Sequence, residues 1–192
     1  MTSAMTGKGP NEIENPVTGE RIVFREGVGD PHAAVLAFDF FIRPGGGVFV
    51  PHLHAHQRET IKVLAGRLVC GMPGSEREVG PGEVVTFEPG EGHVLHAVGS
   101  DEVRARVEFR PAGDAESFLR NYFGLCRDGK SSEKGDLPLP QIALLMPEHG
   151  NFRADIPLLA QRILFALIKP FAKLAGYRSR YPRYAVRGEE RS

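Results

Sequence analysis

The feature that most constrains the fold is a strict alternation of apolar and charged side chains in residues 103–109 (VRARVEF). The apolar side chains fall on one side of an extended strand and the charged ones on the other, which is the pattern of a strand with one buried face. Weaker versions occur at 21–25, 33–43, 60–64, 67–70, 83–87 and 93–98, each bounded by turn residues. Many short strands at close spacing predict an all-β antiparallel sandwich or barrel.

The length and the turn residues indicate one β domain with a short addition. A chain of 192 residues can bury one substantial core, and two large domains are not expected. Its 23 glycines and 15 prolines lie mostly before residue 114 and favour short strands there. We therefore assign residues 14–112 to the β domain and residues 113–192 to a helical C-terminal extension.

Two helices are expected in this extension. The first begins at Asp114, which can cap it, and Gly129 is placed to stop it. The second covers residues 156–175, where Pro170 should introduce a kink and nearly all of the surface outside a narrow charged stripe is apolar. Such a helix needs to be covered, and we expect it to pack against the β domain or a second subunit. A membrane surface is the less favoured alternative, and the basic residues argue against a membrane span.

Charge and cysteine content exclude several classes of function. Basic and acidic side chains are equal in number, so no general basic excess suggests a nucleic-acid partner. The charge is unevenly distributed, with a net −6 over residues 1–150 and +6 over residues 151–192. Two cysteines, and an N-terminus without the apolar core of a signal peptide, lead us to expect a cytoplasmic protein.

Residues 51–60 (PHLHAHQRET) contain three of the seven histidines. If this segment is extended, His52 and His54 share a face, and a turn followed by a new strand can return Glu59 to join them. His93 offers a further nitrogen at the start of a later strand. A set of three nitrogens and one oxygen suits divalent Fe, Mn, Ni, Co, Cu or Zn, and the ligand types do not choose among these ions.

Two motifs resemble those of the cupin family. The first motif of that family is matched at every interval by the following residues: Gly46, His52, His54, Glu59 and Gly66. The second is matched by Gly82, Pro89, Gly90 and His93, but Glu88 replaces the usual proline and Ala97 the usual asparagine. The stretches ENPVTGERIVF and VLAGRL are also similar to single-domain cupins of the conserved-barrel type. The resemblance covers roughly residues 14–112.

The resemblance implies a jelly-roll barrel that holds one divalent metal through His52, His54, Glu59 and His93. It further suggests a metal-dependent dioxygenase similar to single-cupin quercetinases, in which Glu59 is both a ligand and the catalytic proton acceptor. A small-molecule sensor or binding protein with the same pocket remains an alternative, as does a role of the C-terminal helix in oligomerisation or at a membrane surface. We expect a small-molecule ligand and a homodimer.

The other candidate side chains are interpreted as structural. His56 shares the alternation of the two predicted ligands, but the motif spacing leaves it outside the set, so a turn or supporting role is expected. His32 and His96 are interpreted as ordinary polar residues, and Cys70 as a small core residue. The run of glycines at 45–47 lacks the pattern of a phosphate-binding loop and is expected to be a turn.

Overall fold

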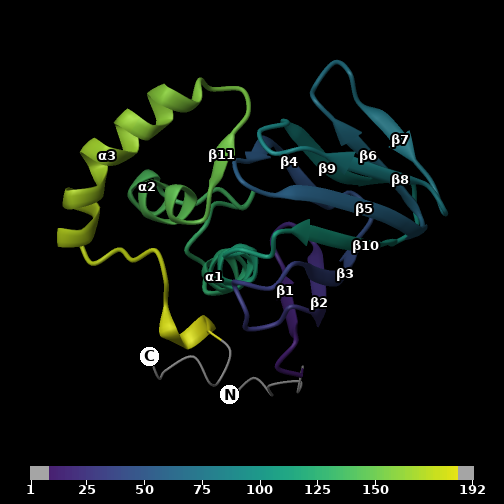
Figure 1. Ribbon diagram of the computed structural model, residues 1–192, viewed down its shortest axis with the longest axis horizontal. Coiled ribbons are helices and arrows are strands. Elements are labelled where there is room, and N and C mark those ends of the chain that lie inside the picture. The colour runs from purple at the N-terminus through teal and green to yellow at the C-terminus, as the bar shows by residue number, and fades with distance from the viewer. Residues whose placement is uncertain (1–8, 186–192) are drawn as a thin grey trace.

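The computed structural model describes residues 9–185, which form two antiparallel sheets followed by helices (Figure 1). The six-stranded sheet has the order β1 (Glu12–Asn15), β2 (Glu20–Glu26), β3 (Leu36–Ile42), β10 (Val103–Arg110), β5 (Arg58–Ala65), β8 (Val84–Phe87). The five-stranded sheet has the order β11 (Asn151–Arg153), β4 (Gly47–His54), β9 (His93–Val98), β6 (Arg67–Gly71), β7 (Arg77–Val79). The prediction of an all-β jelly roll is confirmed, although no hydrogen-bonded ladder joins the two sheets of the described chain into a closed barrel.

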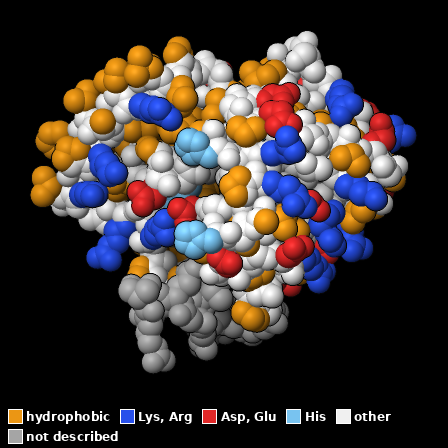
Figure 2. Space-filling model, in the orientation of Figure 1, with side chains coloured by type: hydrophobic (Ala, Val, Ile, Leu, Met, Phe, Trp, Pro, Cys, Tyr) orange, Lys and Arg blue, Asp and Glu red, His pale blue; other side chains and the backbone are white. Residues whose placement is uncertain are grey.

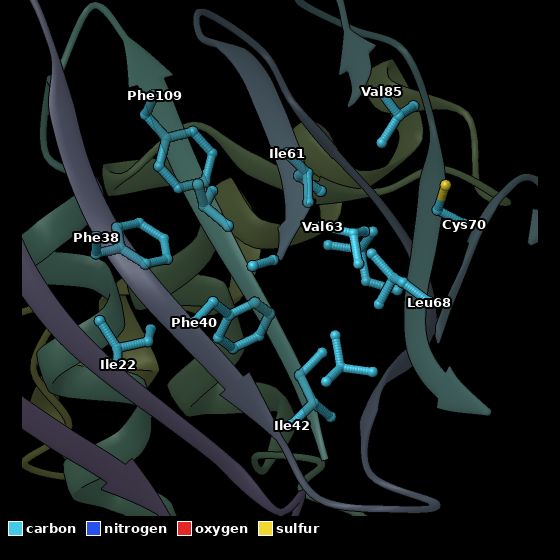
Figure 3. Packing of buried hydrophobic residues seen from close by; sticks show 14 of the residues in the cluster. Ile22, Phe38, Phe40, Ile42, Ile61, Val63, Leu68, Cys70, Val85 and Phe109 are labelled. Atoms are coloured by element: carbon cyan, nitrogen blue, oxygen red, sulfur yellow. The ribbon is translucent and has the colours of Figure 1, made fainter. Parts of the chain in front are cut away.

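The core lies between the two sheets, as the alternation predicts. The four apolar side chains of the 103–109 strand are all buried. They pack with aromatic rings of β3 and aliphatic side chains of β5, and with side chains from β6 and β9 of the opposite sheet (Figure 3). Phe38 makes ring contacts at 5.9 Å with both Phe24 and Phe109. Burial of one face of each sheet therefore holds the sandwich together.

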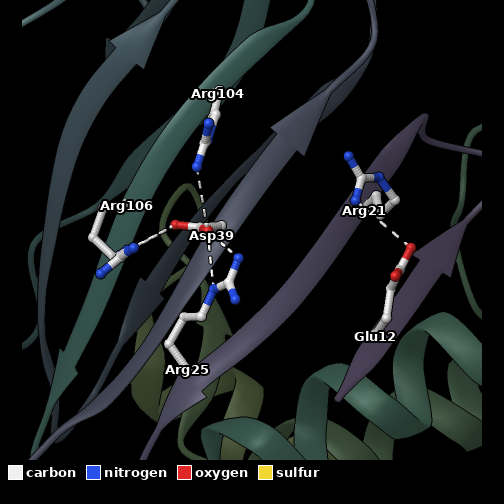
Figure 4. Close-up of polar contacts among 6 residues, drawn as sticks. All are labelled: Glu12, Arg21, Arg25, Asp39, Arg104 and Arg106. Carbon is white, nitrogen blue, oxygen red and sulfur yellow. Dashed lines mark hydrogen bonds and ion pairs between the residues drawn. The ribbon is translucent and has the colours of Figure 1, made fainter. Parts of the chain in front are cut away.

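The outer face of the six-stranded sheet is organised around Asp39, a buried carboxylate of β3. Arg25 and Arg106 each approach it to 2.7 Å, and Arg104 to 3.6 Å (Figure 4). Burial alone would raise the pKa of Asp39, but the guanidinium groups of Arg25 and Arg106 hold it below its ordinary value. The arginines that the alternation places opposite the core are thus paired across three strands.

Gly66, in the turn between β5 and β6, is required by its backbone conformation. Its φ of +73° lies in the left-handed region, and a Cβ there would lie 2.7 Å from the carbonyl oxygen of Glu102 and 2.9 Å from the Cα of Val103. Both atoms belong to backbone, which cannot easily move aside. The motif glycine therefore allows the close approach of the two chain segments.

Replacing Gly66 with Ala is expected to lower the free energy of unfolding by about 2 kcal/mol or more, since left-handed strain adds to this clash. Gly82→Ala is the matched control, because Gly82 has a φ of +90° and open space around the added methyl group. Urea denaturation followed by far-UV circular dichroism measures both variants. Equal losses of stability would contradict the crowding argument at Gly66.

The C-terminal region contains α1 (Ala115–Arg127), α2 (Leu139–Glu148), α3 (Leu158–Leu174) and the 3-10 helix η1 (Pro182–Tyr184). The stop at Gly129 is confirmed, with a φ of +68° just beyond α1. Asp114 occupies the N-cap position as expected, but its side chain makes no capping hydrogen bond and pairs with Arg180 at 2.9 Å. Helix α2 and strand β11 were not expected from the sequence.

The second expected helix forms as α3, but it is not covered by the β sheets. It packs against α2 and β11 through one side, where only Gln161, Phe165 and Ala172 are buried. Its contact with β11 agrees with the expected packing against the β domain, but only on one side of the helix. Packing of the remaining apolar surface against a second subunit stays a prediction. None of the described helices has the length and apolarity needed to span a membrane.

The polypeptide on the two sides of residue 112 is interwoven, because β11 adds to the five-stranded sheet beside β4. The assignment of residues 14–112 and 113–192 to separate units stays a prediction. The absence of a signal peptide was expected partly from residues 1–8, which lie outside the described residues.

Candidate metal centre

Three strands position the four predicted ligands. His52 and His54 lie two residues apart on β4, and His93 opens β9, where it is the direct cross-strand partner of His52. Glu59 is the second residue of β5, in the opposite sheet, and a turn over residues 55–57 separates it from β4. The cluster thus bridges the two sheets at the point where the chain passes from one to the other.

The structure brings one potential ligand atom from each side chain within 4.8 Å of all the others. Glu59 Oε2 lies 2.9 Å from His93 Nε2 and 3.2 Å from His54 Nε2. The imidazole rings of His52 and His93 are 4.3 Å apart between centroids. Glu59 and His93 are buried, whereas His52 and His54 keep some exposure, so the cluster is more accessible from the β4 side.

Backbone carbonyls orient two of the imidazoles. His52 Nδ1 lies 3.2 Å from the carbonyl oxygen of Val50, and His93 Nδ1 lies 3.2 Å from that of Glu91. Because a carbonyl oxygen only accepts, Nδ1 is the protonated nitrogen in both contacts. The lone pair of each neutral ring is then on Nε2, which is the arrangement that metal-ligating histidines commonly show.

Aromatic rings form the wall of the cluster. Phe87 stacks on His93 at 4.0 Å with an angle of 11° between the ring planes, and Phe109 meets His54 edge-on at 4.9 Å. Both phenylalanines belong to the buried core. They restrict ring rotation and exclude water from one side, which holds the nitrogen lone pairs in place.

The electrostatics favour a neutral His52 beside an ionised Glu59. Burial, followed by the nearby His93 and His54, lowers the pKa of His52 to about 3. Burial alone would raise the pKa of Glu59, but the adjacent imidazoles of His54 and His93 outweigh it and lower that pKa. At neutral pH His52 is therefore an uncharged donor of electrons and Glu59 an anion.

The donor atoms fit a metal ion better than they fit one another. His54 Nε2, Glu59 Oε2 and His93 Nε2 are buried and have no hydrogen-bond partner of acceptable geometry among the described residues, despite their short separations. Unpartnered polar atoms of this kind are costly in a folded protein. A divalent ion would satisfy these three atoms and, with the nitrogen of His52, would have three nitrogen ligands and one oxygen ligand.

The remaining candidates lie outside the cluster. His56 is exposed in the turn after β4, and His32 is exposed as well. His96 points away from the site and stacks on Phe49 at 4.9 Å. Cys70 is fully buried in the core, and burial raises the pKa of its thiol, which agrees with a structural role.

One strand and one buried side chain that support the site were not expected from the sequence. β11 pairs with β4 so that Asn151 lies opposite His54 and Arg153 opposite His52. Buried Gln57 donates from Nε2 to the carbonyl oxygen of Ala112 at 2.6 Å, which ties the β4–β5 turn to the end of β10. A strand of three residues is too short to show an alternation in the sequence. Gln57 could have been noticed as a polar residue between His56 and Arg58, with the capacity to tie the turn to another strand.

The fold and the cluster together define a two-sheet jelly roll with a potential 3-His, 1-Glu metal site. Residues 38–108 match the family model described as "Cupin domain", and this match spans the strands that carry all four side chains. The chain therefore carries a cupin domain, which the family model places within residues 38–108. No curated protein matches the chain.

Solved structures resemble the chain at low identity. One is a Klebsiella pneumoniae protein described as an uncharacterized conserved protein with a double-stranded β-helix domain: 19% identity, TM-score 0.39, 41% of this chain and 65% of that one. A second is described as a sugar phosphate isomerase from a cupin superfamily, from Silicibacter pomeroyi. It has 22% identity and a TM-score of 0.44, and the match covers 49% of this chain and 61% of that one. A third is KdgF from Halomonas sp., with 18% identity and a TM-score of 0.44; the match covers 52% of this chain and 86% of that one. The chain spans less than two thirds of the first two, and the likeness concerns the fold alone.

Proposed function

We propose that the chain binds one divalent transition metal through His52, His54, Glu59 and His93 and uses this site to act on a small molecule. The observation that carries the proposal is the convergence of buried, unpartnered donor atoms from two sheets. Four protein ligands leave open positions on a six-coordinate ion, whereas a purely structural ion is better served by closed coordination. A site of this kind is best explained by a ligand that arrives and leaves.

The reaction that we propose is a dioxygenase reaction of the quercetinase-like kind, in which both atoms of dioxygen enter the organic product. A redox-capable ion would supply Lewis acidity and reactivity toward dioxygen. The chain's own groups have distinct roles: Glu59 accepts a proton from an acidic hydroxyl of the substrate, and backbone carbonyls hold the imidazoles of His52 and His93 in orientation. The rings of Phe87 and Phe109 keep water from one side of the site.

Dioxygen uptake tests this proposal. Protein loaded with Fe, Mn, Ni or Co is incubated with flavonols and with small catechol or enol compounds, and oxygen consumption is recorded. We expect uptake by the wild type and a loss of at least 100-fold in Glu59→Gln, since the amide cannot accept the proton. Glu102→Gln, which changes an exposed carboxylate, is the matched control and should retain full uptake.

The second candidate function is a non-catalytic sensor or binding protein. It is favoured by the same accessible site, because open coordination positions serve a reversibly bound ligand equally well. Saturable binding of a test compound without oxygen uptake, for every metal, would replace the dioxygenase proposal with this one. Metal content is measured in each variant, so that loss of the ion is distinguished from loss of the proton acceptor.

A further inference from the structure

The outward face of α3 carries most of the large apolar side chains that are exposed in the described chain. We define this face by six side chains that are 45–85% exposed: Leu159, Ile163, Leu164, Leu167, Phe171 and Leu174. They gather along one edge of the molecule with Lys and Arg side chains beside them (Figure 2). Scattered apolar residues are normal on a protein surface, but a continuous apolar patch marks an interaction site.

The inner side of α3 is already anchored and fixes which side faces outward. The Gln161 amide donates to the carbonyl oxygens of Arg153 and Ile156, at 2.8 Å each, and accepts from the Arg153 N–H at 3.0 Å. Phe165 stacks on Phe152 with 6.5 Å between ring centroids. Because these contacts use the inner side fully, the outward face cannot turn toward the protein without breaking them.

The outward face is wide and uniformly apolar. At 100° per residue, the side chains from Leu159 to Leu164 span about 140° of the helix circumference, and every residue projecting within that arc is apolar. Arg162, Lys169 and Lys173 lie within about 40° of one another, between this arc and the anchored side. α3 contains no Asp or Glu, so the cations are not balanced on the helix itself.

Among the described residues, these three cations also lack a carboxylate partner on other elements. No ion pair of Arg162, Lys169 or Lys173 occurs within residues 9–185, although other arginines there do form ion pairs, such as Arg180 with Asp114. The Arg162 guanidinium lies over the Phe152 ring at 5.6 Å, which leaves its positive charge without a counter-ion. A row of cations that flanks an apolar helix face matches the acyl layer and the phosphate layer of a membrane surface. The apolar face meets the acyl chains, and the cations meet the phosphates.

From this arrangement we propose that α3 docks the protein on an anionic lipid bilayer, lying in the interface with its outward face immersed. A second copy of the chain fits less well. Two paired helices cover a strip of about 100° on each, which leaves part of the arc wet, and an antiparallel pair places both rows of cations on the same side. A bilayer surface covers the whole arc and supplies the opposite charge.

Vesicle flotation of the full chain tests the proposal. We expect binding to vesicles of phosphatidylcholine and phosphatidylglycerol at roughly 3:1, and much weaker binding to phosphatidylcholine alone or in about 0.5 M salt. Leu167→Glu and Phe171→Glu should each lower the partition coefficient more than about 100-fold, because a charge enters the acyl layer. Lys169→Gln combined with Lys173→Gln should lower it roughly 25-fold on anionic vesicles only.

Two matched controls change the same residue types elsewhere. Val84→Glu introduces an acid at an exposed apolar residue of β8, and Lys62→Gln removes an exposed lysine of β5; both should bind as the wild type does. Far-UV circular dichroism checks that every variant is folded. Absence of wild-type binding to any vesicle, or equal loss in the controls, overturns the proposal. So does a lipid-free dimer in light scattering that Leu167→Glu dissociates, since the outward face would then be a subunit interface.

Discussion

His54→Ala is expected to reduce the metal content of the purified protein from close to one ion per chain to a small fraction of that value. His54 is one of four convergent donors, and its Nε2 is a buried atom without a hydrogen-bond partner among the described residues. Loss of a direct ligand should weaken binding at least as much as loss of a supporting contact, which typically costs 10–100-fold in affinity. Elemental analysis after dialysis against trace metal measures the stoichiometry.

His96→Ala is the matched control for this experiment. His96 lies on β9, three residues after His93, but it points away from the cluster and stacks on Phe49. Its variant should keep the wild-type metal content. His93→Ala should lose the ion as His54→Ala does, but it also removes a buried ring that stacks on Phe87, so its stability is measured in parallel. Unchanged metal content in both ligand variants would refute the assignment of these four residues.

Glu20→Gln is expected to make the protein more stable than the wild type at alkaline pH. Glu20 is fully buried beside α1, accepts a hydrogen bond from the Thr18 hydroxyl, and burial raises its pKa to about 7. The carboxyl group is therefore protonated in the folded protein at a pH where it is already ionised in the unfolded chain. Its contribution to stability is complete below the unfolded pKa of 4.5 and is lost as the pH rises through 7.

The size of this effect follows from the pKa difference. A shift of this size corresponds to a loss of about 3 kcal/mol in the free energy of unfolding between about pH 4.5 and about pH 8. Glutamine has no charge to bury, so the variant should gain up to that amount over the wild type at about pH 8 and little at about pH 5. Urea denaturation at both pH values measures the difference between the two proteins.

Glu102→Gln serves as the control for the pH experiment, because Glu102 is exposed in the turn before β10. It should change stability by less than about 0.5 kcal/mol at either pH. A Glu20→Gln variant that is less stable than the wild type at about pH 8 would show that Glu20 is ionised at little cost in the folded state. The cluster of polar groups around it, which includes Tyr122 and Cys126, would then have to stabilise the anion.

Local pattern predicted the strands well, because burial of one sheet face imposes a period of two wherever a strand is long enough to show it. Residues 103–109 illustrate this: their four apolar side chains are at most 4% exposed. Motif spacing predicted which side chains converge, since two histidines two residues apart on a strand must share a face. The glycine at position 66 was likewise readable, and its positive φ explains the requirement.

The errors came from contacts between distant segments. The residue type of Asp114 predicts a cap, but Arg180, 66 residues later, takes its carboxylate. β11 has three residues and forms only because β4 offers an unpaired edge. The position of α3 depends on Gln161 reaching the backbone of β11, which no local pattern contains.

The sequence alone predicted an antiparallel β sandwich or barrel, because alternation acts over a few residues and survives any arrangement of the rest. The resemblance of its two motifs to the cupin family implied the jelly roll and the four candidate ligands. Only the tertiary structure decided that Glu59 lies in the sheet opposite the three histidines, that Glu20 is buried, and that α3 turns an apolar face outward. These outcomes depend on which side chains are buried when segments far apart in the chain pack together, and such packing overrides local preference.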